Sequence, residues 1–312
     1  MTKYVVSGYI GFDNFGDEAI ARVLTQNLKK NGAEKITLIS SNPEKTAKLY
    51  DVNSVGMFGF LKPIMDSDVL ISGGGSLLQD VTSLKSLVYY LGIIMTALFF
   101  RKKVVIFAQG FTPFRTKIGK ILTKFVLKQC HTITVRDKKS KELLAGMGID
   151  SILVTDPVFG IEIPQKEKSG IGLQLRSFPA LTDEFVEKLV DEIKTRFPDE
   201  EIKLISLQDS LDLPVLEKIE GKILKNLTVD EVIDEISSLK YFVAMRFHAC
   251  LIGAKAGVNV VGINYDIKVE TLAKTLGFPL IELNGDGLKD GFEQTGNYII
   301  PEFHSIFDTE QN

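Results

Sequence analysis

An arginine and a histidine stand two residues apart in this chain, between two apolar runs. The residues before them, Tyr241–Ala244, have the pattern of a buried strand, and Ala249–Ala256 has small and apolar residues at helical spacing. We therefore expect Arg246 and His248 on a strand-to-helix turn, where open α/β sheets bind ligands and helix N–H groups favour an anion. A fixed cation beside a titratable imidazole indicates capture of an anionic substrate with proton transfer nearby. The alternative is a purely structural pair.

A first glycine-containing turn, Gly8–Glu18, follows the first strand and opens a helix. Its spacing does not match Gly-x-Gly-x-x-Gly, which disfavours a nicotinamide dinucleotide. Asp17 and Glu18 lie in the first helical turn, where negative charge is favourable. Either Asp17 and Glu18 only stabilise the start of the helix, or they bind hydroxyl groups of a ligand. The two acids make this turn a poor phosphate site.

A second turn contains three consecutive glycines, Gly73–Gly75, after the strand Val69–Ser72. Glycine loses more conformational entropy on folding than any other residue, so this run indicates a backbone close to a ligand or to another domain. No lysine follows in the register of a phosphate-binding loop, which excludes a nucleoside triphosphatase turn. A simple tight turn is the alternative.

Two further cations follow apolar strands. Arg136 comes directly after Thr132–Val135, and Lys268 lies five residues after Val260–Ile263. For Arg136, three alternatives are open: it pairs with its neighbour Asp137, it lies on the surface, or it lies in a cleft. With Arg246 they would hold a ligand that carries two or three negative charges.

The elements that position these residues alternate between short apolar strands and helical patterns, which predicts parallel sheets covered on both faces. We expect an α/β protein with two doubly wound Rossmann-like domains facing a cleft, and a ligand between them. The domains are predicted at 1–160 and 169–285, joined through a proline-containing linker at 156–169, with a tail at 286–312 that packs back on the first domain. In the first domain, strands are predicted at Tyr4–Ser7, Lys35–Ile39, Val69–Ser72, Val104–Ala108, Thr132–Val135 and Ile152–Thr155. In the second, they are predicted at Gly170–Leu175, Ile202–Ser206, Tyr241–Ala244 and Val260–Ile263.

Composition narrows the class of protein. The 312 residues carry a formal charge of −3, which gives no reason to expect nucleic acid as a partner. The two cysteines lack metal-ligand spacing, so no metal is expected, and with no signal peptide before the first strand they favour a reducing cytoplasm. The apolar segment Leu84–Phe100 is shorter than the roughly 20 residues of a spanning helix. A buried helix is favoured there, and a face resting on a membrane surface is the alternative.

Taken in order, these motifs resemble those of the polysaccharide pyruvyltransferase family. They are Gly8–Ile20, Gly73–Asp80, Gln109-Gly110, Val135–Asp137, Asp156-Pro157, Arg246–Ala249 and Tyr265–Lys268. The chain is most similar to the CsaB type, which acts on precursors of secondary cell-wall polymers. The resemblance spans Gly8 to about Leu276 and implies a fold like that of GT-B glycosyltransferases.

The resemblance also implies an activity. Such enzymes transfer pyruvate from phosphoenolpyruvate to two hydroxyls of a sugar, forming a cyclic ketal and releasing phosphate, and phosphoenolpyruvate is then a substrate rather than a cofactor. For the CsaB type the sugar is lipid-linked N-acetylmannosamine, which would place the enzyme at the inner face of the cell membrane. The alternatives are a GT-B-type glycosyltransferase using a nucleotide sugar and a binding protein that senses sugars or nucleotides.

The candidate residues fit that chemistry as one set for the donor and catalysis and a second set for the acceptor. Guanidinium groups bind planar oxyanions by forked hydrogen bonds, and one acid–base group is needed at the reacting carbon. We expect His248, Arg246 and Lys268 to be catalytic, and Arg136, Arg246 and Lys268 to bind the donor. We expect Asn14, Asp17, Gly74 and Gly75 to bind the acceptor from the first domain.

Overall fold

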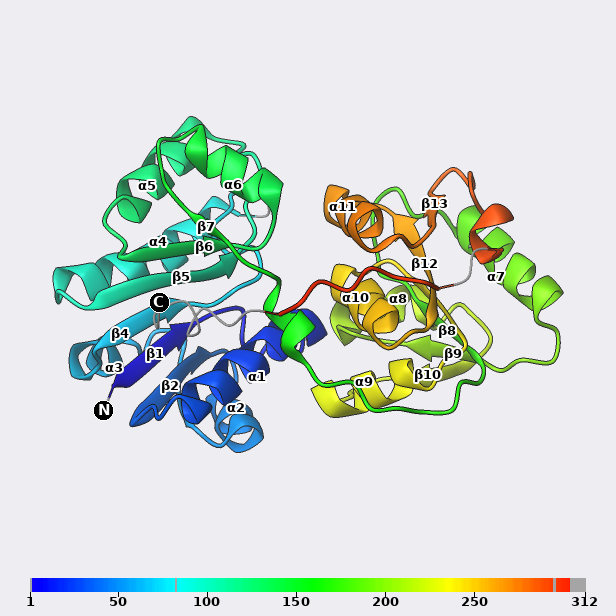
Figure 1. Ribbon diagram of the computed structural model, residues 1–312, viewed down its shortest axis with the longest axis horizontal. Coiled ribbons are helices and arrows are strands. Elements are labelled where there is room, and N and C mark those ends of the chain that lie inside the picture. The colour runs from blue at the N-terminus through cyan, green and yellow to red at the C-terminus, as the bar shows by residue number, and fades with distance from the viewer. Residues whose placement is uncertain (1, 82, 294–295, 304–312) are drawn as a thin grey trace. The chain divides into compact units, whose positions relative to one another are not determined.

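The computed structural model describes residues 2–81, 83–293 and 296–303, and divides them into two compact units. Unit 1 takes in the chain up to Gly160 and resumes at Glu302, and unit 2 is Ile161–Pro301. Each unit is built on one parallel sheet with helical crossovers (Figure 1). The prediction of two doubly wound α/β units is confirmed.

Unit 1 has a seven-stranded sheet in the order β3-β2-β1-β4-β5-β6-β7. Its strands are β1 (Lys3–Ser7), β2 (Lys35–Ser40), β3 (Asn53–Gly56), β4 (Val69–Ser72), β5 (Lys103–Gln109), β6 (Thr132–Val135) and β7 (Ile152–Leu153). Its helices are α1 (Phe15–Lys30), α2 (Pro43–Tyr50), α3 (Leu61–Asp66), α4 (Leu84–Phe99), α5 (Lys117–Leu127) and α6 (Lys138–Ala145), followed by a 3-10 turn at Pro157–Gly160. The chain leaves β1 in one direction and β4 in the other, so the strand order reverses between these two strands.

Unit 2 repeats this plan with six strands in the order β10-β9-β8-β11-β12-β13. Its strands are β8 (Ile171–Gln174), β9 (Ile202–Ile205), β10 (Lys222–Leu224), β11 (Tyr241–Ala244), β12 (Asn259–Asn264) and β13 (Leu280–Glu282). Its helices are α7 (Asp183–Arg196), α8 (Asp209–Leu216), α9 (Val229–Ser237), α10 (Phe247–Lys255) and α11 (Ile267–Leu276), with a 3-10 turn at Asp290–Phe292. Here the order reverses between β8 and β11.

Local sequence explains where the helices begin. The side chains of Thr116, Asp137 and Thr182 accept a hydrogen bond from a backbone N–H in the first turn of α5, α6 and α7. Thr228 and Glu231 form the predicted capping box at the start of α9. These caps fix the helix starts at the carboxyl edge of each sheet, where the loops that carry the candidate site residues also lie.

The central strands are buried on both faces, as their near-continuous apolar sequences predict. In unit 1 they pack with α4 through Leu87, Leu91 and Ile94. The predicted apolar helix is thus α4, with one face in the core. Within the described residues, no helix combines the length and the apolar character needed to cross a membrane.

The sequence analysis did not predict the edge strands β3, β10 and β13. They are short, and their residues are mostly only partly buried, so they lack the apolar run that marked the central strands.

The tail contacts both units in turn. In unit 2, the backbone N–H of Ile299 donates to Leu276 O at 3.1 Å and that of Val260 donates to the Tyr298 hydroxyl at 2.6 Å. In unit 1, Thr155 Oγ1 donates to Glu302 O at 3.0 Å. The end of the predicted tail, residues 304–312, lies outside the described residues.

Candidate functional site

The carboxyl ends of β8 and β11 meet where the strand order of unit 2 reverses, which is the place where open α/β sheets bind ligands. Arg246 follows β11 and is the N-cap residue of α10. Its backbone N–H donates to Gln174 Oε1, at the end of β8, at 2.9 Å. This bond joins the two strand ends and fixes the start of the helix that carries His248.

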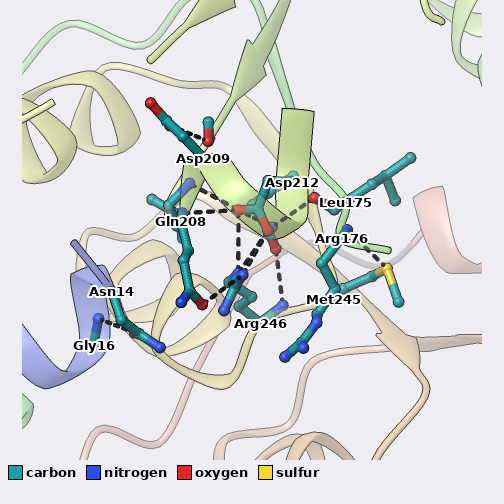
Figure 2. Close-up of polar contacts among 12 residues, drawn as sticks. Asn14, Gly16, Leu175, Arg176, Gln208, Asp209, Asp212, Met245 and Arg246 are labelled. Atoms are coloured by element: carbon teal, nitrogen blue, oxygen red, sulfur yellow. Dashed lines mark hydrogen bonds and ion pairs between the residues drawn. The ribbon is translucent and has the colours of Figure 1, made fainter. Parts of the chain in front are cut away.

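The guanidinium of Arg246 forms a buried ion pair with Asp212 of α8 (Figure 2). Nη2 donates to Asp212 Oδ1 at 2.5 Å, and Nε lies 3.1 and 3.2 Å from the two carboxylate oxygens. The Arg246 side chain is 10% exposed and that of Asp212 is 0% exposed. Asp212 therefore holds Arg246 in one orientation, whatever ligand the arginine meets.

Asp212 is itself held by the loop after β9. The backbone N–H groups of Leu207 and Gln208 donate to its Oδ2 at 2.8 and 3.1 Å, and the Gln174 amide donates to the same oxygen at 3.2 Å. A buried carboxylate without such bonds would be costly. Sequence reasoning missed Asp212, because α8 contains Pro214 and had no clear helical pattern.

A second arginine, Arg176, lies two residues past the end of β8 and was also missed. Its Nε is buried and has no hydrogen-bond partner among the described residues. Its Cζ lies 5.7 Å from the ring centroid of Tyr265, within cation–π range. A cation directly after an apolar strand was the signal that singled out Arg136 and Arg246, and the same signal marks Arg176.

Tyr265 follows β12 and lies close to the charges of Arg176 and Arg246. Burial raises the pKa of its hydroxyl, whereas the charges of Arg176 and Arg246 act in the opposite direction. The ring also packs edge-on against Phe178, with centroids 5.2 Å apart. Tyr265, at the end of β12, thus interacts with side chains that follow both β8 and β11.

His248 and Lys268 each occupy the second position of a helix, α10 and α11, rather than the preceding turn. The His248 ring packs at 89° to the ring of Phe247, with centroids 4.9 Å apart, and is half-buried. Lys268 is half-buried too, and its backbone N–H donates to the cap residue Asp266 at 2.8 Å. Both helices begin at the carboxyl edge of the sheet.

Unit 2 therefore gathers Arg176, Arg246, His248 and Lys268 at the ends of adjacent strands. Cations combined with helix N-termini bind phosphates and carboxylates. A half-buried imidazole in the same region can exchange a proton with a bound ligand. The structure places three of the predicted site residues in this region and adds Arg176 to them; their roles stay predictions.

In unit 1, the two glycine-containing turns meet where the strand order reverses between β1 and β4. A Cβ atom added to Gly75, whose φ is +87°, would lie 2.8 Å from Asp17 Oδ1. One added to Gly74 would lie 3.2 Å from Ile20 Cγ2. Asn14 caps α1 by accepting from Gly16 N at 3.1 Å. The four predicted acceptor residues are thus close together, and the close approach explains the glycines.

Glu18 anchors the first of these turns. Its Oε1 accepts from Gly11 N at 2.7 Å, and its Oε2 accepts from the Tyr50 hydroxyl. Burial raises the pKa of Glu18 above its ordinary value of 4.5, although both hydrogen bonds act to lower it. Asp17 and Glu18 therefore differ: Asp17 borders the glycine turn, whereas Glu18 holds the loop in place.

Gln109, at the end of β5, is a further candidate in unit 1. It is completely buried, and neither amide atom has a hydrogen-bond partner among the described residues. The preceding Ala108 has a φ of +44°, a strained conformation for a residue with a side chain, at a register shift between β5 and β6. The backbone of Gln109 also forms an isolated parallel β-bridge with that of Gly75. Strain and an unsatisfied amide beside a glycine turn are features of ligand sites.

Arg136 is buried in unit 1. Its Nη1 donates to Asp156 Oδ2 at 2.7 Å, with side-chain exposures of 6% and 3%. Its Nη2 lies 3.5 Å from Ser76 Oγ, next to the second glycine turn. The pair with Asp156 gives Arg136 a structural role, and binding of the donor by Arg136 stays a prediction.

No group of three or more metal-ligating side chains that could hold an ion is found in the described ranges of the chain. The model of one protein family, described as polysaccharide pyruvyl transferase, matches residues 14–267. None of the curated proteins compared with the chain matches it significantly.

Several solved structures share the fold at low identity. UDP-GlcNAc 2-epimerase from Methanocaldococcus jannaschii has a TM-score of 0.67 at 11% identity, covering 97% of this chain and 96% of that one. The Neisseria meningitidis enzyme bound to UDP-GlcNAc has a TM-score of 0.64 at 10% identity, covering 93% and 90%. A spinosyn rhamnosyltransferase complexed with spinosyn aglycone has a TM-score of 0.52 at 10% identity, covering 94% and 89%. These likenesses bear out a GT-B-like fold.

Proposed function

This chain is an enzyme of the polysaccharide pyruvyl transferase family, and we propose that its donor is phosphoenolpyruvate and its acceptor a lipid-linked sugar of a surface polysaccharide. Pyruvate would be attached to two hydroxyls of that sugar as a cyclic ketal, with release of phosphate. For an enzyme of the CsaB type the sugar is N-acetylmannosamine, and the reaction takes place at the cytoplasmic face of the membrane.

The gathering of cations in unit 2 is the observation that carries the donor assignment. Phosphoenolpyruvate has a carboxylate and a phosphate on one carbon, so its site needs several cations within a small space. Arg176, Arg246 and Lys268 follow three adjacent strands, β8, β11 and β12. Guanidinium groups suit both oxyanions. Because Nε and Nη2 of Arg246 are held by Asp212 and Gln208, its Nη1 is the group that would meet the donor. Arg176 is the residue that we add to the donor site on structural grounds.

The reaction requires two hydroxyl protons to be relocated. One ends on the methylene carbon of phosphoenolpyruvate, which becomes the methyl group, and this leaves an oxocarbenium-like centre at the neighbouring carbon. A sugar hydroxyl adds there, and the second hydroxyl then displaces phosphate, which carries away the other proton. His248 is the side chain that we assign to one of these transfers, an effect worth roughly 10²–10⁴-fold. Lys268 would neutralise the charge of the departing phosphate.

We assign the acceptor to unit 1. Asn14, Asp17 and the Gly74-Gly75 backbone offer both donors and acceptors, which hydroxyl and N-acetyl groups need. Carboxylates would repel a donor with several negative charges, so these turns suit a neutral sugar better. The buried amide of Gln109 lies in the same region and supports this assignment.

Phosphate release from phosphoenolpyruvate, measured with a panel of lipid-linked or synthetic amino-sugar acceptors, tests the proposal. We expect release only with an acceptor that has a suitable pair of hydroxyls, and a mass increase of that acceptor by one pyruvyl group. Thermal unfolding provides the discriminating control. Stabilisation by UDP- or CMP-sugars, without an effect of phosphoenolpyruvate, would instead identify a glycosyltransferase. Binding of ligands without any product would indicate a sensor.

A further inference from the structure

Helix α5 in unit 1 exposes an apolar face that its own unit does not cover. Ile118, Ile121 and Phe125 are 61%, 65% and 59% exposed, and Leu122 is 38% exposed. Their spacing of three and four residues places them on one side of the helix. The opposite side, with Thr123, Val126 and Leu127, is buried, and Val126 and Leu127 belong to the hydrophobic core of unit 1. A helix with two apolar faces buries one within its own fold and leaves the other for a partner.

Lysines accompany this face along the whole helix. Lys117, Lys120 and Lys128 are exposed and Lys124 is half-buried. None of the four forms an ion pair with a described residue. On the helix they lie in one stripe beside the apolar side chains. This combination of a lysine stripe and an apolar stripe is typical of helices that lie in the interface of a membrane.

The charge extends well beyond α5. Residues 81–136 contain no aspartate or glutamate. Besides the lysines of α5 they include Lys85 and Arg115 near the starts of the two helices, and Arg101, Lys102 and Lys103 at the opposite end of α4. The chain as a whole is negative, at −3. The positive charge is therefore concentrated on the segment that forms α4, β5 and α5. Such a concentration attracts an anionic surface and is screened by salt.

The neighbouring helix α4 adds apolar exposure. Val88 is 50% exposed and Leu84 is 37% exposed, and both belong to the first half of α4. Both helices start at the carboxyl edge of the parallel sheet, because each is a crossover between neighbouring strands (Figure 1). Asp80 ties the two starts together: it precedes α4 and accepts hydrogen bonds from Arg115 N at 2.7 Å and Thr116 N at 2.8 Å.

We propose that the exposed face of α5, together with the start of α4, docks unit 1 onto an anionic lipid bilayer. The apolar side chains enter the interface between headgroups and acyl chains, and the lysines contact lipid phosphates. A second copy of the chain fits less well, because a two-fold contact would bring the lysine stripe against itself without any acid to neutralise it.

The docking face lies near the turns that we assign to the sugar. The loop that leads into α4 begins at the Gly73–Gly75 turn, and Asp80 at its end holds the start of α5. The membrane would therefore lie next to the turns that we assign to the sugar. A lipid-linked acceptor could present its headgroup there while its chains stay in the bilayer. This second step rests on the proposed function, whereas the docking itself does not.

Vesicle flotation of the full-length protein tests the docking without any assay of activity. We expect binding to phosphatidylcholine vesicles that contain phosphatidylglycerol, little binding to phosphatidylcholine alone, and weakening by salt. Ile121→Asp/Phe125→Asp should reduce binding at least tenfold, because it places charges in the interface. Lys117→Gln/Lys120→Gln should reduce it on the order of tenfold. Lys188→Gln/Lys194→Gln on α7 removes two exposed lysines elsewhere and should change nothing.

A fluorescent reporter gives an independent readout, since the chain contains no tryptophan. In Phe125→Trp, the emission should shift to shorter wavelength when phosphatidylglycerol vesicles are added. The matched control Ile299→Trp replaces an exposed apolar residue of unit 2, 75% exposed, and should show no shift. Circular dichroism melting checks that each variant is folded.

Three results would overturn the proposal. The first is absence of flotation with anionic vesicles. The second is equal flotation of the wild type and folded Ile121→Asp/Phe125→Asp. The third is a concentration-dependent dimer in sedimentation that this double variant dissociates, without vesicle binding, which would assign the face to a second copy. Loss of pyruvyl transfer alone would not bear on the docking.

Discussion

Replacing Asp212 by asparagine should destabilise unit 2 strongly. The change keeps the shape of the side chain but removes its charge, so the guanidinium of Arg246 is left buried and unpaired. Removing one partner of a buried ion pair costs roughly 3–5 kcal/mol. The upper part of this range applies here, because Asp212 has no exposed surface and accepts bonds from Leu207 N, Gln208 N and the Gln174 amide as well.

A double-mutant cycle separates the ion pair from these other bonds. Arg246→Met removes the cation but leaves Asp212 with its backbone N–H donors, so it should cost less than Asp212→Asn. In Asp212→Asn/Arg246→Met no unpaired charge remains, and the cost should fall below the sum of the single changes by about 2–3 kcal/mol. The comparison therefore measures the coupling between the two side chains.

Urea unfolding followed by circular dichroism provides the free energies. Because the chain divides into two compact units, hydrogen exchange of peptides from β8 and β11 tests whether the affected transition belongs to unit 2. We expect exchange of β1 and β4 to stay unchanged, since these strands belong to unit 1. A loss of less than about 1 kcal/mol in Asp212→Asn, or additive effects in the cycle, would refute the view that Asp212 holds Arg246 in place.

Four further predictions follow from the site residues. His248→Ala should fold normally and lower kcat by roughly 10²–10⁴-fold, as expected for an acid–base group; turnover near that of the wild type at saturating substrates would remove His248 from the mechanism. Arg176→Lys should weaken phosphoenolpyruvate binding in calorimetry, because an ammonium cannot replace the guanidinium fork, and unchanged affinity would take Arg176 out of the donor site. Asp17→Asn should raise KM for the acceptor and leave phosphoenolpyruvate affinity unchanged, so a crystal structure with the sugar bound only by unit 2 would contradict it. Burial raises the pKa of Glu18 above 4.5, so the stabilisation from its protonated form is complete below pH 4.5 and is lost as the pH rises through the raised pKa. Glu18→Gln should therefore be more stable than the wild type at neutral pH but not below pH 4.5. Thermal melts across this pH range measure the difference.

The fold could be predicted from the sequence because its signals are local. Apolar strands such as Val69–Ser72 and Tyr241–Ala244 alternate with capped helices, and this alternation is typical of a doubly wound sheet. Short edge strands such as β10 could not be predicted, since half-covered strands need no apolar run. Their pairing depends on the sheet that is already present.

The candidate site, like the fold, has residues that the sequence predicts and residues that it does not. Residues that directly follow a buried strand or open a helix, such as Arg136, Arg246 and Asp17, are visible in the sequence, because their position on the carboxyl edge follows from the elements themselves. By the same logic Arg176 could have been found. The pattern of chemically suitable residues in order along the chain also identified the family.

Only the tertiary structure decided which side chains are partners. Asp212 is 34 residues from Arg246 in the chain, and Asp156 is 20 residues from Arg136. No periodicity links such residues, because the contact arises from the order in which the strands are laid side by side. Likewise, the sequence shows that α5 is apolar on more than one side, but only packing determined that Ile121 and Phe125 remain exposed while Val126 is buried. Burial is a property of the assembled layers, and a local pattern cannot choose between two faces that are equally apolar.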